Sequence, residues 1–361
     1  MLEVAPTSNI VYLSHGSQKF YDQTTFSVMT LLWRLIQANR GDIQIVIYTD
    51  QTQSAPQHPL VKVVEITRDE LRRYKGRFDY VHRIKHCVLL RASRELAGPI
   101  LYVDCDTRWL EIPDQALDIL KQDLGSTSPH CCMHEIDGAF SENHFPDYHR
   151  YITEHAEELK AQGINHLDRL LNWNAGAIGL PEGNTRFFED ALKISDFVFT
   201  KVKPRNWVEQ FAWSLVGCDR YQMFALGNCL HHYWGYSYEA PIYLKHFFKN
   251  LPRNSSVEEM AKACATHEWS KETLIDIQQH FKHVWVRRWN KLKNSLNNSC
   301  TLGTLVDPPT STTSSICDLD FLASFKTCST GAIVLVKKSI AKLSNLALVN
   351  TVLKSIPSYN A

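Results

Sequence analysis

The sequence predicts an α/β protein whose mixed, mainly parallel sheet is flanked by helices and followed by a helical C-terminal extension. Three observations support this prediction. The chain opens with a strand–helix–strand pattern, a later apolar strand ends in two aspartates, and further apolar runs alternate with amphipathic stretches. Alternating strands and helices are typical of parallel sheets, whose strands need helical crossovers between them.

Composition narrows the class of protein. The 361 residues suit one large α/β domain with additions, and a formal net charge of +1 gives no electrostatic argument for nucleic acid as a partner. Ten cysteines without a CxxC pair indicate reduced thiols. The N-terminus lacks the basic start and apolar core of a signal peptide, and no apolar run is long enough to span a bilayer. We therefore expect a cytoplasmic protein.

The first elements form a βαβ unit. Residues 9–14 are a predicted strand, residues 20–38 carry apolar side chains at helical spacing, and residues 43–48 form a second buried strand that ends at Thr49-Asp50. The loop after Ser14 lacks GxGxxG and GxxxxGK[ST], which excludes the usual dinucleotide fingerprint and phosphate loop. Asp50 either accepts hydrogen bonds from a base or ribose or caps a turn, and the sequence leaves both open.

A third strand and two helices follow. Residues 61–66 predict a more exposed strand, residues 68–74 a short charged helix, and residues 80–96 a longer helix. The longer helix carries Arg83, which we expect to face solvent. It also carries Lys85, which either meets a bound diphosphate or faces solvent as well.

The central stretch of the chain is a buried strand that runs directly into two carboxylates. Residues 100–103 are apolar, follow Gly98-Pro99, and lead into Asp104-Cys105-Asp106. Ligands of open α/β sheets bind at the carboxyl ends of the strands, so we expect Asp104 and Asp106 to line a binding crevice. Oxygen ligands suit Mg²⁺ or Mn²⁺, which often share their coordination with substrate phosphates. The alternative is an aspartate-rich turn that caps the next helix.

The middle of the chain holds a second candidate region. A helix is predicted up to about residue 121, a strand over residues 129–135, and a helical stretch covering the site over residues 145–162. Three residues of the strand, His130, His134 and Glu135, have metal-ligand character, although their spacing also fits alternating faces of a strand. In residues 171–180, small residues allow close approach of a ligand and Asn174 offers a donor and an acceptor. A glycine-containing sheet strand is the alternative.

Two helices and two short strands complete this region. Helices are predicted over residues 187–199 and 207–216, and the second begins with Glu209-Gln210, where an acid also suits the helix dipole. Short strands are predicted over residues 223–226 and 229–235. One of the two histidines, His231 or His232, is able to complete a metal site with Asp106, because neutral imidazole is a common ligand of manganese-like ions.

The C-terminal part differs in composition from the rest. Helices are predicted over residues 257–264 and 271–292, and residues 295–315 form a linker rich in Ser, Thr, Asn and Pro. Residues 332–356 contain four lysines and no acidic residue. Such a segment either lies on an anionic membrane or docks on the domain or a partner. We divide the chain into a main domain (1–250), a helical extension (251–294), the linker (295–315) and a cationic amphipathic tail (316–361).

The ordered set of motifs resembles the nucleotide-sugar-dependent glycosyltransferases of the GT-A (Rossmann-like) fold, and in particular the glycogenin and bacterial galactosyltransferase type. The resemblance covers about residues 8–245. Its carrying residues are the strand Ile10 to Leu13, Tyr48-Thr49-Asp50, Leu101 to Asp106, Asn174-Ala175-Gly176, Glu209-Gln210, and His232-Tyr233-Trp234-Gly235, which matches the family's His-x-x-Gly.

The resemblance implies a hexosyl transfer from a nucleoside-diphosphate sugar, a UDP-sugar, to a hydroxyl of a glycan, lipid or protein, with Mn²⁺ or Mg²⁺ and with retention of the anomeric configuration. It implies that Asp104, Asp106 and His232 bind the metal. The implied donor-binding residues are Ser14, Asp50, Lys85 and Asp104, the sugar- or acceptor-binding residues are Asn174 and Gly176, and the catalytic residues are Glu209 and Gln210. The predicted location is the cytoplasm, with peripheral membrane contact through the tail.

The sequence departs from the family at two places. The family's Lys-Pro-Trp is replaced by Ser237-Tyr238-Glu239, so Lys85 or Lys245 would have to meet the diphosphate. Glu209 stands where the family has Asp before Gln210, which leaves the stereochemical outcome open.

Two other classes remain as alternatives. Asp104-x-Asp106-Thr107 also resembles the nucleophile motif of haloacid-dehalogenase-like phosphohydrolases, although the later lysine and acidic pair of that family are not found. A non-catalytic module that binds a glycan or a membrane is the second alternative.

Overall fold

The computed structural model describes residues 7–123, 126–237, 239–252 and 254–267. The described residues fall into two units, one that runs to residue 234 and includes 251–267, and one of residues 235–250 that contains helix α9 (Glu239–Asn250). The predicted helix at 271–292, the linker and the cationic tail lie outside the described residues.

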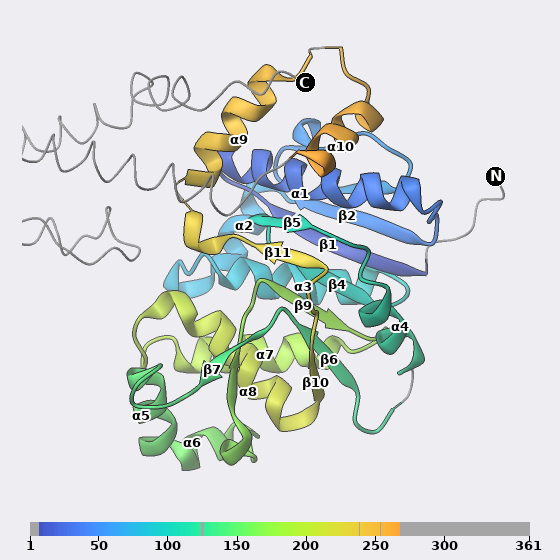
Figure 1. Cartoon of the computed structure of the whole chain (residues 1–361). Coiled ribbons are helices and arrows are strands. Elements are labelled where there is room, and N and C mark those ends of the chain that lie inside the picture. Colours follow the sequence, from blue (N-terminus) through green and yellow to red (C-terminus); the bar gives the residue numbers. More distant parts are fainter. Residues whose placement is uncertain (1–6, 124–125, 238, 253, 268–361) are drawn as a thin grey trace, which may run out of the picture. The chain divides into compact units, whose positions relative to one another are not determined.

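A seven-stranded sheet forms the centre of the first unit, with the strand order β10-β6-β9-β4-β1-β2-β3 (Figure 1). The strands are β1 (Ser8–Ser14), β2 (Ile43–Thr49), β3 (Val61–Glu65), β4 (Ile100–Val103), β6 (His130–Met133), β9 (Ala177–Leu180) and β10 (Gln222–Ala225). Strand β9 runs antiparallel to β4 and β6, whereas the other neighbours pair in parallel. The predicted fold class, a mixed and mainly parallel sheet flanked by helices, is confirmed.

Helices cover both faces of the sheet, as Figure 1 shows, with α1 and α10 on one face and α3, α7 and α8 on the other. The helices of this unit are α1 (Gln18–Gln37), α2 (Arg68–Lys75), α3 (Arg83–Glu95), α4 (Asp114–Gln122), α5 (Pro146–Glu154), α6 (Ala156–Ala161), α7 (Thr185–Val198), α8 (Val208–Arg220) and α10 (Val257–Thr266). Because both faces are covered, β1 and β2 are almost continuously buried, as parallel strands usually are.

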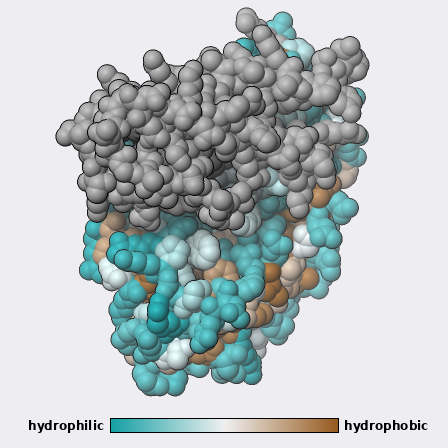
Figure 2. All heavy atoms as spheres, turned by 60° about the vertical axis from the view of Figure 1, so that its left-hand side comes forward, coloured by the Kyte–Doolittle hydropathy of each residue, from teal (hydrophilic) through white to brown (hydrophobic). Residues whose placement is uncertain are grey.

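The hydropathy of the described part is apparent on its surface and along its helices. On the face drawn in Figure 2, the described surface is mostly hydrophilic and is interrupted by hydrophobic patches. Within the described ranges, none of the helices combines the length and apolar character needed to span a bilayer.

Two short antiparallel pairs stand beside the main sheet. Strand β5 (Thr107–Trp109) pairs with β11 (Leu230–His232), and β7 (Ile136–Ala139) pairs with β8 (Leu171–Trp173). Strands β5 and β7 and helix α9 were not predicted from the sequence. Strand β5 begins directly after Asp106, so the chain leaves the sheet at the carboxyl end of β4 and continues along β11.

A chain of buried hydroxyl groups ties β5 to the sheet and to α1. The Ser27 Oγ lies 3.0 Å from the Tyr12 hydroxyl and 2.8 Å from Thr107 Oγ1. Thr107 in turn donates to the backbone oxygen of Asp104 at 2.8 Å, and the Trp109 indole donates to Tyr12 at 2.6 Å. Buried polar groups are tolerated only when they are hydrogen-bonded, so this chain holds the turn at Asp104 in one conformation.

The hydroxyl chain gives a stability prediction. Tyr12→Phe leaves the buried Trp109 indole without its acceptor and is expected to lower the free energy of unfolding by about 1–3 kcal/mol in urea titrations. Tyr151→Phe is the matched control, because the buried Tyr151 hydroxyl has no hydrogen-bond partner among the described residues. Equal effects of the two substitutions would contradict a structural role for the chain.

Candidate metal and donor site

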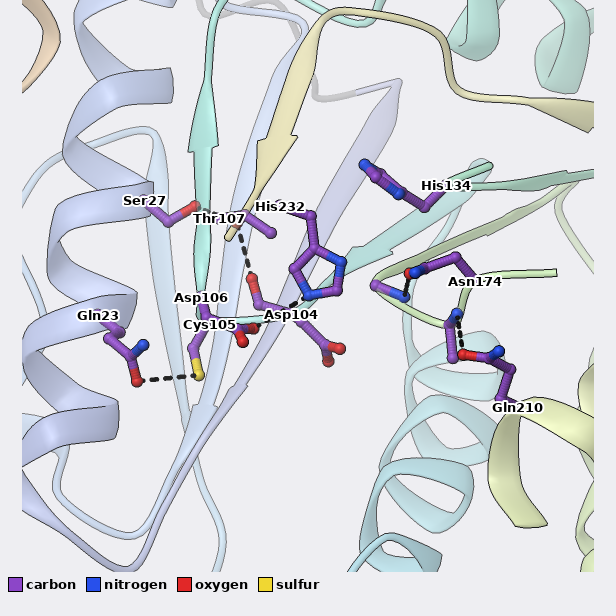
Figure 3. A network of polar contacts seen from close by, with 12 residues as sticks. Gln23, Ser27, Asp104, Cys105, Asp106, Thr107, His134, Asn174, Gln210 and His232 are labelled. Carbon is purple, nitrogen blue, oxygen red and sulfur yellow. Dashed lines mark hydrogen bonds and ion pairs between the residues drawn. The ribbon is translucent and has the colours of Figure 1, made fainter. Parts of the chain in front are cut away.

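Three predicted metal ligands, Asp104, Asp106 and His232, meet at the carboxyl end of β4 (Figure 3). Their ligand atoms all lie within 4.8 Å of one another, and His232 Nε2 is 3.4 Å from Asp106 Oδ1. The β5–β11 register explains this meeting, since His232 pairs with Thr107 and the Tyr233 amide donates to the Asp106 backbone oxygen at 3.0 Å. Two carboxylates and an imidazole suit Mn²⁺ or Mg²⁺.

Asp106 and His232 stabilise each other's charge. Burial alone would raise the pKa of Asp106, but the hydrogen bond and charge of His232 lower it below its ordinary value. Burial likewise opposes the charge on His232, and the bond to Asp106 raises its pKa above the ordinary value. A metal ion binds neutral imidazole, so cation binding at this site is expected to release the His232 proton.

Gly176 makes room for the histidine. Strand β9 starts beside the end of β4, and the Asp104 amide donates to the Gly176 oxygen at 2.9 Å. A Cβ atom at position 176 would stand 2.2 Å from His232 Nδ1, which no folded structure tolerates without displacement. The glycine therefore allows the imidazole to reach Asp106. This steric role comes in addition to the predicted contact of Gly176 with a sugar, which stays a prediction.

Lys85 lies buried between two carboxylates. Its Nζ is 2.8 Å from Asp104 Oδ1 and 2.7 Å from Glu209 Oε1, and the residue is only 8% exposed. The rings of Tyr102 and Trp213 stand 5.1 and 5.2 Å from the ammonium group. Burial opposes the charge, but Asp104 and Glu209 outweigh it and raise the pKa of Lys85. The alternative of a solvent-facing Lys85 is therefore wrong.

Arg83 lies two residues before Lys85 on α3. It was expected to face solvent, and this expectation is wrong. Its guanidinium forms a two-bonded ion pair with Asp196 of α7 at 2.8 and 2.9 Å. The pair connects α3 to α7 and keeps the start of α3 in place.

Glu209 is more than an acid in a first helical turn. Its side chain is 4% exposed and contacts Lys85 and, at 3.4 Å, His82. Burial would raise its pKa, but Lys85 first and His82 next lower it to about 2. The ion pair of Glu209 with Lys85 therefore contributes its full stability at pH values above 4.5, the ordinary pKa of a glutamate. This stability is lost only as the pH falls toward about 2. A carboxylate with a pKa this far below neutral pH is a weak general base, because it holds an accepted proton only weakly.

Gln210 and Asn174 are brought together by Asp137, which the sequence analysis missed. The Asp137 carboxylate accepts from Asn174 Nδ2 at 3.1 Å and from Gln210 Nε2 at 2.8 Å. A single aspartate before Gly138 has the pattern of a turn, so no signal in the sequence distinguished it. Figure 3 shows Asn174 and Gln210 on the side of the site away from α1.

Ser14 and Asp50 lie at the carboxyl ends of β1 and β2, on the same edge of the sheet as Asp104. Asp50 accepts a hydrogen bond from the Tyr21 hydroxyl at 2.7 Å, and Tyr21 accepts one from the Gly16 amide at 2.9 Å. A small pocket opens here, lined among others by Ser14, Tyr21, Thr24, Thr49, Gln51 and Pro56.

The histidines and glutamate at β6 are not part of the metal group found among the described residues. His130 begins β6 and lies beside Asp123, whereas Glu135 is 57% exposed. His134 does approach the site, because its ring packs edge-on against the His232 ring at 5.3 Å. Burial and then His232 lower the pKa of His134, which favours its neutral form.

Comparison with known proteins gives likenesses in structure alone. No protein-family model matches the sequence, and no curated protein matches it either. The apo structure of the bifunctional glycosyltransferase WbbM is similar at 11% identity and a TM-score of 0.43, over 74% of this chain and 52% of that one. This chain thus spans about half the length of WbbM.

Two further structures are similar. Apo mouse xyloside xylosyltransferase 1 has 9% identity and a TM-score of 0.38, over 61% of this chain and 85% of that one. The galactosyltransferase LgtC with donor and acceptor sugar analogues has 11% identity and a TM-score of 0.40, over 74% and 99%. All three TM-scores lie below 0.5, so these likenesses assign no role to any residue of this chain.

The buried Lys85 gives the second prediction. Lys85→Met leaves the buried Glu209 carboxylate without its ammonium partner and is expected to lower the free energy of unfolding by about 3–5 kcal/mol in metal-free buffer. Adding Glu209→Gln removes the buried negative charge and is expected to restore much of that loss. The control is Lys201→Met at a more exposed pair with Glu158, with an expected change below about 1 kcal/mol. A double variant no more stable than Lys85→Met would refute the burial argument.

Proposed function

We propose that this protein is a glycosyltransferase of the GT-A type that moves a hexosyl group from a nucleoside-diphosphate sugar to a hydroxyl acceptor with the help of a divalent cation. The observation that carries the proposal is the convergence of Asp104, Asp106 and His232 at the carboxyl end of a central strand, beside the buried pair of Lys85 and Glu209. The sequence resemblance to the family supports the same reading.

The metal ligands and the sheet edge are suited to the donor. Asp104, Asp106 and His232 would hold Mn²⁺ or Mg²⁺, and the bound cation would supply charge neutralisation for the diphosphate leaving group. The sheet edge at the ends of β1 and β2 offers the Ser14 hydroxyl and the Asp50 carboxylate for a base or ribose. A UDP-sugar is the proposed donor, on the strength of the family resemblance.

Glu209 and Gln210 are suited to the sugar. Glycosyl transfer passes through a state in which positive charge develops at the anomeric carbon. A carboxylate that Lys85 keeps ionised, next to an amide oxygen, stabilises such a charge without taking up a proton. Because Glu209 is a weak base, it is poorly suited to activate an acceptor from the opposite face, and we propose that the reaction retains the anomeric configuration.

The remaining expectations are part of the same proposal. The acceptor is a hydroxyl group of a glycan, lipid or protein. The enzyme works in the cytoplasm and contacts membranes through its cationic tail, which binding to anionic vesicles tests.

A donor screen tests the proposal. The full-length protein is incubated with a panel of nucleoside-diphosphate hexoses, with and without Mn²⁺, and release of the nucleoside diphosphate is measured. Cation-dependent release from at least one donor is expected. Asp106→Ala should abolish it and should also abolish Mn²⁺-dependent binding of UDP in calorimetry, whereas Asp118→Ala at an exposed helical position should change neither.

Two results would contradict the proposal. One is UDP binding by Asp106→Ala that equals the wild type. The other is phosphate release from p-nitrophenyl phosphate without cleavage of any nucleotide sugar, which would favour the phosphohydrolase alternative.

The anomeric configuration of the product is a separate prediction. NMR of the freshly formed product should show the configuration of the donor. Glu209→Gln should lower kcat by about 10²–10³-fold, the size seen when one preorganised electrostatic contact is removed, while donor affinity changes little. An inverted product, or a variant with nearly full kcat, would refute the proposed role of Glu209.

A further inference from the structure

The Asp137 carboxylate binds two side-chain amides at once. Its Oδ1 accepts from Asn174 Nδ2 at 3.1 Å and its Oδ2 accepts from Gln210 Nε2 at 2.8 Å. At the other end of each amide, a backbone N–H is the partner. Gln210 Oε1 accepts from the Ala175 amide at 3.1 Å, and Asn174 Oδ1 accepts from the Gly176 amide at 2.8 Å.

These partners determine where the nitrogen and the oxygen of each side-chain amide lie. A carboxylate only accepts hydrogen bonds and a backbone N–H only donates them. The amide nitrogens must therefore face Asp137, and the amide oxygens must face residues 175–176. The partners at both ends of each amide therefore fix its orientation.

The loop that receives the two amide oxygens borders the metal group. The Gly176 oxygen accepts from the Asp104 amide at 2.9 Å, and a Cβ at Gly176 would meet His232. The Gln210 amide oxygen is thus directed toward the loop at residues 175–176, which lies next to Asp104. A positive charge that develops on a sugar there is stabilised by an amide oxygen and opposed by an amide N–H.

We propose that Asp137 is a positioning residue that keeps the Gln210 and Asn174 amides turned with their oxygens toward the reacting sugar. The inference rests on the proposed function and adds to it a residue that no motif of the sequence contains. Asp137 itself does not touch the substrate. It acts through the orientation of Gln210.

The placement of Asp137 favours this role over a general structural one. Asp137 lies on β7, a short strand outside the seven-stranded sheet, whose pairing with β8 is irregular between Ile136 and Gly138. Its neighbour Ile136 is 50% exposed, so this segment contributes little to the core. A change at Asp137 is therefore expected to alter the amides more than the stability of the protein.

The decisive variant is Asp137→Asn, which keeps the shape and removes one acceptor. An asparagine offers one oxygen and one NH₂ group, so it satisfies one amide and opposes the other donor with a donor. The other amide is then released or turned over. We expect kcat for the donor found in the screen to fall about 10–100-fold, the size typical of residues that orient the groups of a site. The donor KM, the Mn²⁺ affinity and the melting temperature should stay close to wild type.

The matched control is Asp190→Asn, at a partly buried aspartate that pairs with Arg186 one turn earlier on α7 and with Arg220 at the end of α8. It should leave kcat unchanged.

A second measurement exchanges the carboxylate and the amide between positions 137 and 210. Gln210→Glu sets two carboxylates against each other and should lower the melting temperature, and adding Asp137→Asn restores a donor opposite an acceptor and should recover it.

The outcomes separate the two proposals. A wild type that cleaves no nucleotide sugar overturns the proposed function. A working wild type together with an Asp137→Asn variant of unchanged kcat overturns the inference about Asp137 alone. The inference is also overturned if the fall in kcat of Asp137→Asn is matched by loss of Mn²⁺ binding or by a fall in melting temperature. It is overturned as well if the double variant Asp137→Asn/Gln210→Glu is no more stable than Gln210→Glu.

Discussion

The site depends on one buried ammonium group held between two carboxylates. Lys85 comes from α3, Asp104 from the end of β4 and Glu209 from the first turn of α8, so three separate elements meet at one charge. Removing Lys85 would leave the buried Glu209 carboxylate without its ammonium partner, and this makes the relative placement of the three elements energetically costly to change. Lys85 also lowers the pKa of Glu209, so this buried carboxylate stays ionised across the neutral pH range.

A second constraint is the direction of β9. In a sheet that is otherwise mainly parallel, an antiparallel strand starts at the edge where its neighbours end. Residues 174–176 thereby lie beside Asp104, although about seventy positions separate them in the sequence. The same reversal supplies backbone N–H groups to two amides and, at Gly176, space for His232. Helix α8 and strand β7 complete this group of amide hydrogen bonds with Gln210 and Asp137.

Much of the fold and of the metal group was predictable from the sequence because it has a local signature. Strands that are buried on both faces are continuous apolar runs, and the pair Asp104 and Asp106 follows one of them directly. His232 was predicted through the family's His-x-x-Gly pattern. The β5–β11 pairing that delivers it was not predicted, because three residues after a turn carry too little periodicity.

The roles of Lys85, Arg83 and Asp137 were hard to predict from the sequence for one physical reason. Lys85 and Arg83 look like residues of a solvated helix face, and their burial is decided by Glu209 and Asp196 more than a hundred positions away. Asp137 stands alone before a glycine, and its role arises only when Asn174 and Gln210 are brought to it. Ion pairs and amide hydrogen bonds between distant elements leave no periodic trace in a sequence.

The charges of the site bear on how an anionic donor would enter it. Within the group of Lys85, Asp104, Asp106 and Glu209, three carboxylates face one ammonium, and once His232 is neutral the group carries two net negative charges. A nucleoside diphosphate is also negative, and the one cation of this group is already engaged by two carboxylates. Such a surface repels a free diphosphate and attracts a divalent cation, whose charge equals the excess. The proposed cation dependence of donor binding is therefore a consequence of the residues of this chain, and it would hold whichever sugar the donor carries.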